Sequence, residues 1–115
     1  MKKLAITLFF ALAANAFAAD TVVKGYLVDT ACQQDDGNTP NFGAEHSKQC
    51  LEMAECIRSG YGVLTEDKKY IKFDKPGNVE AKKFIDALTK KKDIRVAVTG
   101  SVSGDKMTVT KIELQ

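Results

Sequence analysis

The alternation of apolar and polar residues predicts a chain built mainly from short strands. Five runs are rich in β-branched and aromatic residues, and turn-forming residues separate them. These runs are 21–28, 61–64, 69–73, 94–102 and 107–114. Gly25 lies inside the first run and predicts a bulge or sharp bend there. The residues Ser-Gly-Asp-Lys at 103–106 predict a hairpin between the last two strands.

Helical spacing of apolar residues occurs in two segments. The first is 44–59, which ends before Gly60, and the second is 79–89, which Asn78 is expected to cap. Within the first segment, one helical face carries His46, Cys50, Met53, Ala54 and Ile57. Within the second, the buried face is expected to contain Ala81, Phe84, Ile85 and Leu88. The polar stretch 29–43 is predicted to be a long loop.

The order of these elements predicts a mainly β fold with two helices, of the α+β class. Without the segment 29–60 the order is three strands, a helix and two strands, which is the order of an OB-fold. We therefore expect residues 19–115 to form one OB-like domain with a five-stranded barrel. The segment 29–60 is then a helical insertion between the first two strands, where OB-folds often bind ligands.

The start of the chain has the pattern of an export signal. Lys2 and Lys3 precede an apolar run at 4–17, and Ala-Phe-Ala at 16–18 matches a signal-peptidase site. We expect residues 1–18 to be cleaved and the rest to be periplasmic or secreted, with no membrane span. The chain has 17 Lys and Arg against 15 Asp and Glu. Loss of the two leader lysines would leave a formally neutral domain, which argues against a nucleic-acid partner.

All three cysteines and the single histidine lie between residues 32 and 56. Cys32, His46, Cys50 and Cys56 form the pattern C-x13-H-x3-C-x5-C. Three thiolates and one imidazole would complete a tetrahedral shell for Zn²⁺, and Cu(I) would also suit the soft sulfur ligands.

Two neighbouring residues fit the same hypothesis. Met53 could contribute a thioether to Cu(I), and Asp29 could be an outer-shell partner of His46.

The helix geometry constrains the alternative of a disulfide. In a regular helix Cys50 and Cys56 would lie about 9 Å apart along the axis, too far for a disulfide. Either the helix breaks near 52–55, or Cys32 is the partner of one of them.

These motifs resemble a group of small exported bacterial proteins with no assigned activity. The resemblance rests on Gly-Tyr-Leu-Val-Asp-Thr-Ala-Cys at 25–32, on the histidine and two cysteines that follow, and on Ser-Gly-Tyr-Gly-Val at 59–63. It covers most of the chain after the leader, including Val-Thr-Gly at 98–100. The resemblance implies an exported OB-like domain with a Cys/His cluster, and no reaction.

Three functions remain open for the cluster. The first is transition-metal binding, and the second is a disulfide-stapled binding module for an unidentified periplasmic partner. The third is a thiol-based redox enzyme in which His46 activates Cys50, although no C-x-x-C motif or third orienting residue accompanies the pair. We favour metal binding, because it alone uses His46 and the odd number of sulfurs together.

Overall fold

The computed structural model describes residues 20–115. The predicted signal peptide, residues 1–18, lies outside these residues. Within them, five strands form one sheet that closes into a ring, in the order β1-β2-β3-β5-β4. The strands are β1 (Thr21–Asp29), β2 (Tyr61–Thr65), β3 (Tyr70–Phe73), β4 (Arg95–Ser103) and β5 (Lys106–Leu114). Their positions match the five predicted runs to within one or two residues, so the mainly β prediction is confirmed.

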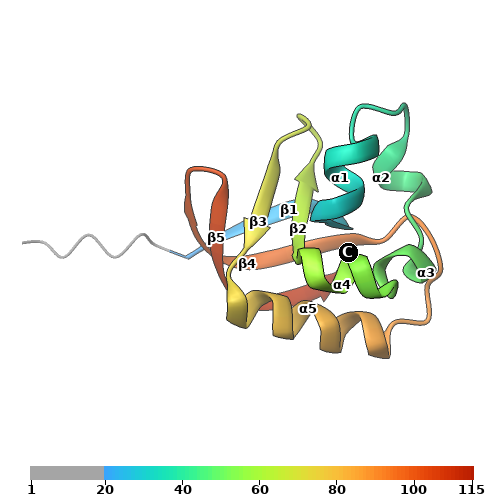
Figure 1. Ribbon diagram of the computed structural model, residues 1–115. Coiled ribbons are helices and arrows are strands. Elements are labelled where there is room, and N and C mark those ends of the chain that lie inside the picture. Colours follow the sequence, from blue (N-terminus) through green and yellow to red (C-terminus); the bar gives the residue numbers. More distant parts are fainter. Residues whose placement is uncertain (1–19) are drawn as a thin grey trace, which may run out of the picture.

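The ring is antiparallel except at one join. β1 pairs with β2 on one side and with β4 on the other, and β4 and β5 form the predicted hairpin. The short parallel pairing of β3 with β5 closes the ring. Figure 1 shows α1 to α4 gathered at the end of the molecule opposite this hairpin, with α5 lying across the base of the ring.

Side chains that alternate along the strands fill the interior of the ring. Val96 and Val98 of β4 are fully buried, while Ala97 between them is more exposed. The helix α5 (Lys75–Ala87) covers one opening with Ala81 and Ile85, both fully buried. The core also contains Leu27, Leu51, Tyr61, Val63, Ile71, Phe73, Leu88, Ile94, Met107 and Val109.

Glycines permit close contacts between strands, as Gly25 and Gly100 show. A bulge or a sharp bend was predicted at Gly25, and the bulge is wrong, because β1 pairs in unbroken register on both sides there. A Cβ at Gly25 would instead lie 2.2 Å from the carbonyl oxygen of Leu64. The register shift occurs between Thr99 and Gly100, where a Cβ on the glycine would lie 1.9 Å from the carbonyl oxygen of Thr108.

Residues 20–115 contain five short helices, where two were predicted. Part of the expected loop 29–43 is helical, as α1 (Thr30–Asp36), and the expected helix 44–59 is divided into three. These are α2 (Phe42–Glu45), α3 (Lys48–Leu51) and α4 (Ala54–Ser59). All four lie between β1 and β2, as predicted for the insertion. The single helical face that was to carry the cluster therefore does not exist.

Specific backbone contacts explain the two breaks. His46 and Ser47 are extended, and Ser47 forms a β-bridge with Lys92 while the Lys48 N–H donates to the carbonyl of Lys91 at 2.8 Å. This pairing competes with helix hydrogen bonds. The Ser47 hydroxyl then accepts from the Cys50 N–H and starts α3. The second break is at extended Met53, within the predicted range 52–55.

The predicted cap of the last helix is also wrong. Asp74 rather than Asn78 caps α5, because its side chain accepts from the Gly77 N–H at 2.9 Å, and Pro76 suits the first helical turn. The Asn78 side chain instead accepts from the Tyr61 N–H at 2.9 Å and joins α5 to β2.

Candidate metal centre

Asp29 is the buried polar residue around which the site is built. It is the last residue of β1, it caps α1, and its exposed fraction is 0%. One carboxylate oxygen accepts from the Cys32 N–H at 2.9 Å, and the other accepts from His46 Nε2 at 2.7 Å. Burial alone would raise the pKa of Asp29, but the bonds from His46 and the Cys32 N–H together lower it to about 2. Asp29 is therefore a buried anion at neutral pH.

The bond to Asp29 determines the tautomer of His46. An ionised carboxylate can only accept, so His46 Nε2 carries a proton, and in the neutral form of the ring Nδ1 is the nitrogen with the lone pair. The imidazole is 6% exposed and lies against the ring of Phe42, with centroids 5.1 Å apart. The predicted pairing of Asp29 with His46 is confirmed.

Cys32 and Cys56 meet beside this carboxylate. Their sulfur atoms are 3.9 Å apart, and none of the three cysteines forms a disulfide. One carboxylate oxygen of Asp29 and these two sulfurs all lie within 4.8 Å of one another, which is close enough to hold a metal ion. Asp29 was predicted only as an outer-shell partner, and the geometry also allows it to be a ligand.

Local hydrogen bonds hold the two cysteines in place. The start of α1 is attached to the end of α4 by the Thr30 N–H, which donates to the Gly60 carbonyl at 2.9 Å. Ser59 strengthens this join, because its hydroxyl accepts from the Ala31 N–H and donates to the Cys56 carbonyl. These contacts hold the backbone of α1 and that of α4 next to each other, which places the two cysteines side by side.

The environment keeps both thiols protonated. Burial, together with the negative charge of Asp29, raises the pKa of Cys56 to about 11 and raises that of Cys32 further. A thiol nucleophile needs the opposite environment, with a lowered pKa. A bound cation would reverse the balance, since it would offset the carboxylate charge and favour both thiolates.

Cys50 lies outside the close group. It is half-buried, at the end of α3, and is not among the three residues whose donor atoms lie within 4.8 Å of one another. It lines a pocket of about 260 Å³ that Cys32 and His46 also line. Of the four predicted ligands, the structure thus brings Cys32 and Cys56 together. His46 is linked to them through Asp29, and Cys50 lies at the adjoining pocket.

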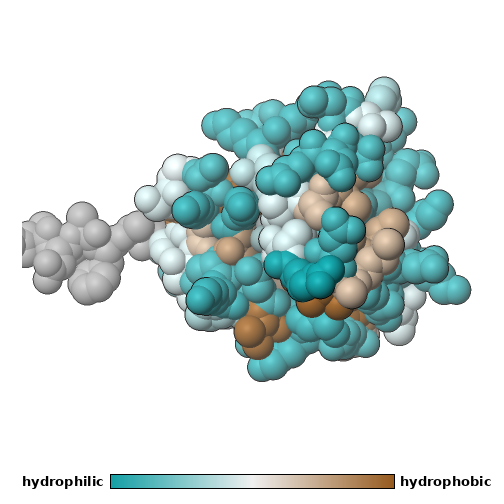
Figure 2. All heavy atoms as spheres, in the orientation of Figure 1, coloured by the Kyte–Doolittle hydropathy of each residue, from teal (hydrophilic) through white to brown (hydrophobic). Residues whose placement is uncertain are grey.

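Met53, the predicted thioether ligand, is exposed. It lies at the junction of α3 and α4, with an exposed fraction of 55%. On the face shown in Figure 2, hydrophobic residues form small patches near α4 and α5 within a mostly hydrophilic surface.

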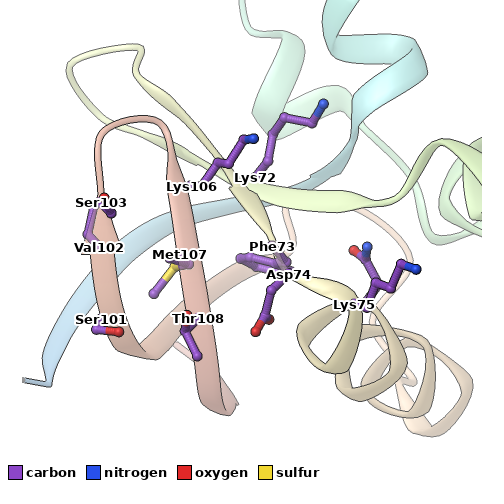
Figure 3. Close-up of a pocket in the computed structure, with 11 residues that line it drawn as sticks. Lys72, Phe73, Asp74, Lys75, Ser101, Val102, Ser103, Lys106, Met107 and Thr108 are labelled. Atoms are coloured by element: carbon purple, nitrogen blue, oxygen red, sulfur yellow. The ribbon is translucent and has the colours of Figure 1, made fainter.

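Another pocket, larger than the one beside Cys50, contains none of the thiols. It has a volume of about 460 Å³ and lies between the β4–β5 hairpin, β3 and the start of α5 (Figure 3). Its lining includes Lys72, Lys106 and Met107 but no cysteine or histidine. The carboxylate of Asp74 in this lining already accepts from the Gly77 and Val109 N–H groups. The metal-ligand chemistry is therefore concentrated at the opposite, helical end of the ring.

Among residues 20–115, none of the helices combines the length and the apolar content that crossing a membrane would require.

The chain was compared with protein-family models, curated proteins and solved structures, and none of the three comparisons gives a match.

Proposed function

We propose that this protein is an exported domain that binds one transition-metal ion through the thiolates of Cys32 and Cys56 and the carboxylate of Asp29. The observation that carries the proposal is the convergence of these three donor atoms within 4.8 Å. Two sulfurs and one oxygen at this spacing suit a small ion with bonds of about 2.0 to 2.3 Å. Solvent or His46 would complete the coordination.

The charges of the donors favour Zn²⁺ over Cu(I). Two thiolates and one carboxylate carry three negative charges in a mostly buried site, so a divalent ion neutralises more of this charge than a monovalent ion. The carboxylate oxygen is also a hard donor, which Zn²⁺ accepts more readily than Cu(I). Both ions suit the sulfurs, so the oxygen decides the preference.

We also propose that the closed ring is an OB-like barrel. With α1 to α4 set aside, the order is three strands, one helix and two strands, and the first strand pairs with the second and the fourth. The metal site then lies in the loop between the first two strands, which borders the ligand face of OB-folds.

We further propose, from the sequence, that the protein is exported and belongs to a group of small exported bacterial proteins. The basic and apolar leader supports a periplasmic or secreted protein, and the motifs at 25–32 and 59–63 support membership of the group of exported proteins described above.

The test is metal analysis of protein that carries single substitutions. Purified reduced protein should bind one Zn²⁺ per chain, as measured by native mass spectrometry and elemental analysis. Cys32→Ser and Cys56→Ser should each weaken binding by more than roughly 100-fold, since loss of a ligand costs more than loss of an outer-shell partner. Asp35→Asn is the control, because Asp35 is an exposed carboxylate on the same helix as Cys32. Undiminished binding by both serine variants would refute the ligand assignment.

One observation favours a second function, the disulfide-stapled binding module. The sulfurs of Cys32 and Cys56 are close enough that a small side-chain movement would bring them to bonding distance. Closing a loop of 24 residues would stabilise the fold by about 3 to 4 kcal/mol. Protein isolated from the periplasm without reductant would then weigh two hydrogens less than the reduced chain and would take up no Zn²⁺.

A further inference from the structure

Two groups of donor atoms share one cysteine. Cys32 belongs to the buried group with Asp29 and Cys56, and it also lines the 260 Å³ pocket with His46 and Cys50. Cys56 and Asp29 do not line this pocket, and both are buried. The pocket is therefore the surface opening that leads to Cys32, and two further donors border it.

The His46 ring has one nitrogen that could bind a ligand in this pocket. Its Nε2 proton is engaged by Asp29, and among the described residues this is the ring's only hydrogen bond. In the neutral ring Nδ1 then carries a lone pair, and His46 is 6% exposed and lines the pocket. A histidine that donates one nitrogen to a carboxylate and offers the other to a metal is a recurrent arrangement in metal sites.

Cys50 is the cysteine that lies outside the buried group. It is half-buried, like Cys32, and its α3 segment is held by the Ser47 cap and by the backbone pairing of 47–48 with 91–92. The backbone of Cys50 is thus held beside the pocket that the residue lines. A thiol in such a position is reached by a metal carrier before Cys56 is reached.

We propose that Cys50, His46 and Cys32 form an outer position through which the metal ion enters and leaves the buried position. The inference rests on the proposed function. An entering ion exchanges the sulfurs of its carrier for Cys50 and Cys32, which each release a thiol proton as they bind, and the freed carrier thiolates can take these protons up. The ion then exchanges Cys50 for Cys56, so that Cys56 releases its thiol proton and Cys50 takes one back. No electrons are transferred. The exchange partner is a carrier or acceptor with thiolate ligands, small or narrow enough to reach the pocket.

If the ion passes through the outer position, substitutions there should change the rates of Zn²⁺ transfer more than the affinity. Removing a ligand that binds only in passing lowers the association and dissociation rates by the same factor, so the affinity changes little. For Cys50→Ser we expect Zn²⁺ transfer to and from a small dithiol chelator to slow at least tenfold, with Kd within about threefold of wild type. His46→Gln keeps an N–H that can donate to Asp29 and lacks the Nδ1 donor, so transfer should slow in this variant as well.

The experiment is stopped-flow transfer of Zn²⁺ between the full chain and the chelator, with Kd measured separately by competition. Gln49→Ala is the control, because Gln49 is an exposed neighbour of Cys50 on α3 and does not line this pocket. If Cys50→Ser and His46→Gln both transferred Zn²⁺ at the wild-type rate, the proposal of an outer position would be refuted. A Kd weakened by more than about 30-fold in Cys50→Ser would also overturn it, since Cys50 would then be a resident ligand. If the wild-type chain bound no Zn²⁺, the proposed function itself would fail.

Discussion

Replacing Asp29 by Asn removes the charge on which the whole site depends. The side chain keeps its size and can still cap α1, since an amide oxygen can accept from the Cys32 N–H. Its NH₂ group would then face the protonated Nε2 of His46, so the 2.7 Å bond between them is lost unless the ring changes tautomer. The substitution therefore isolates the charged bond while preserving the shape of the site.

The pKa of Asp29 gives the expected magnitude. It is lowered from 3.8 to about 2 in the folded protein, and each pKa unit corresponds to about 1.4 kcal/mol. The ionised carboxylate thus contributes roughly 2 kcal/mol to the free energy of unfolding at pH 7. For a domain of this size, Asp29→Asn should lower the Tm by roughly 10 °C.

The pH dependence has a defined direction. Because the pKa is lower in the folded state, the unfolded chain binds more protons between the two values. The contribution is complete above about pH 4 and is lost as the pH falls toward 2. The difference in stability between wild type and Asp29→Asn should therefore be about 2 kcal/mol at pH 7 and should approach zero near pH 2.

Urea denaturation of reduced, metal-free protein, followed by circular dichroism, measures this difference. Asp35→Asn serves as the control, since the exposed Asp35 carboxylate on the same helix should contribute within about 0.5 kcal/mol. Equal stability of wild type and Asp29→Asn at pH 7 would refute the reasoning, as would a difference that persists unchanged at pH 2.

Three further predictions concern the thiols and their support. Tyr61→Phe should cost about 1 to 3 kcal/mol in urea denaturation, because the buried Tyr61 hydroxyl donates to the Leu51 carbonyl at 2.6 Å; a cost near zero would contradict this. The pKa of Cys56, about 11, should fall in Asp29→Asn when the thiolate absorbance near 240 nm is titrated, and an unchanged titration would show that the carboxylate does not act on the sulfur. Because the pKa values of Cys32 and Cys56 are both raised, Zn²⁺ binding should release two protons and strengthen about 100-fold per pH unit around neutrality, as measured by competition at two pH values. Affinity independent of pH would exclude binding by two thiols that are protonated beforehand.

The strands could be predicted from the sequence because their signal is local. The alternation of β-branched residues and the Ser-Gly-Asp-Lys turn each depend only on a few neighbouring residues. The strands and the hairpin that they predict are all present in the structure. The helices of the insertion could not be predicted in the same way. The break at His46 and Ser47 depends on pairing with residues 91–92, which are more than 40 positions away in the chain.

The site was predicted in composition but not in arrangement. A regular helix through 44–59 would have placed His46 and Cys50 on one face, whereas the breaks move Cys56 toward Cys32 and leave Cys50 at the pocket. The role of Asp29 had a local signal, since an Asp at the end of a strand and three residues before Cys32 is a typical helix cap. The burial of the Asp29 charge beside both thiols could not be predicted, because it depends on the packing of α1 against α4.

X-ray absorption spectroscopy of the Zn²⁺-loaded chain tests the ligand assignment most directly. The account predicts two sulfur neighbours at about 2.3 Å, with oxygen or nitrogen filling the remaining positions at about 2.0 to 2.2 Å. The spectrum should stay the same in Cys50→Ser and should lose one sulfur in Cys56→Ser. A first shell without sulfur, or one that is unchanged in Cys56→Ser, would contradict the assignment of Cys32 and Cys56 as the metal ligands.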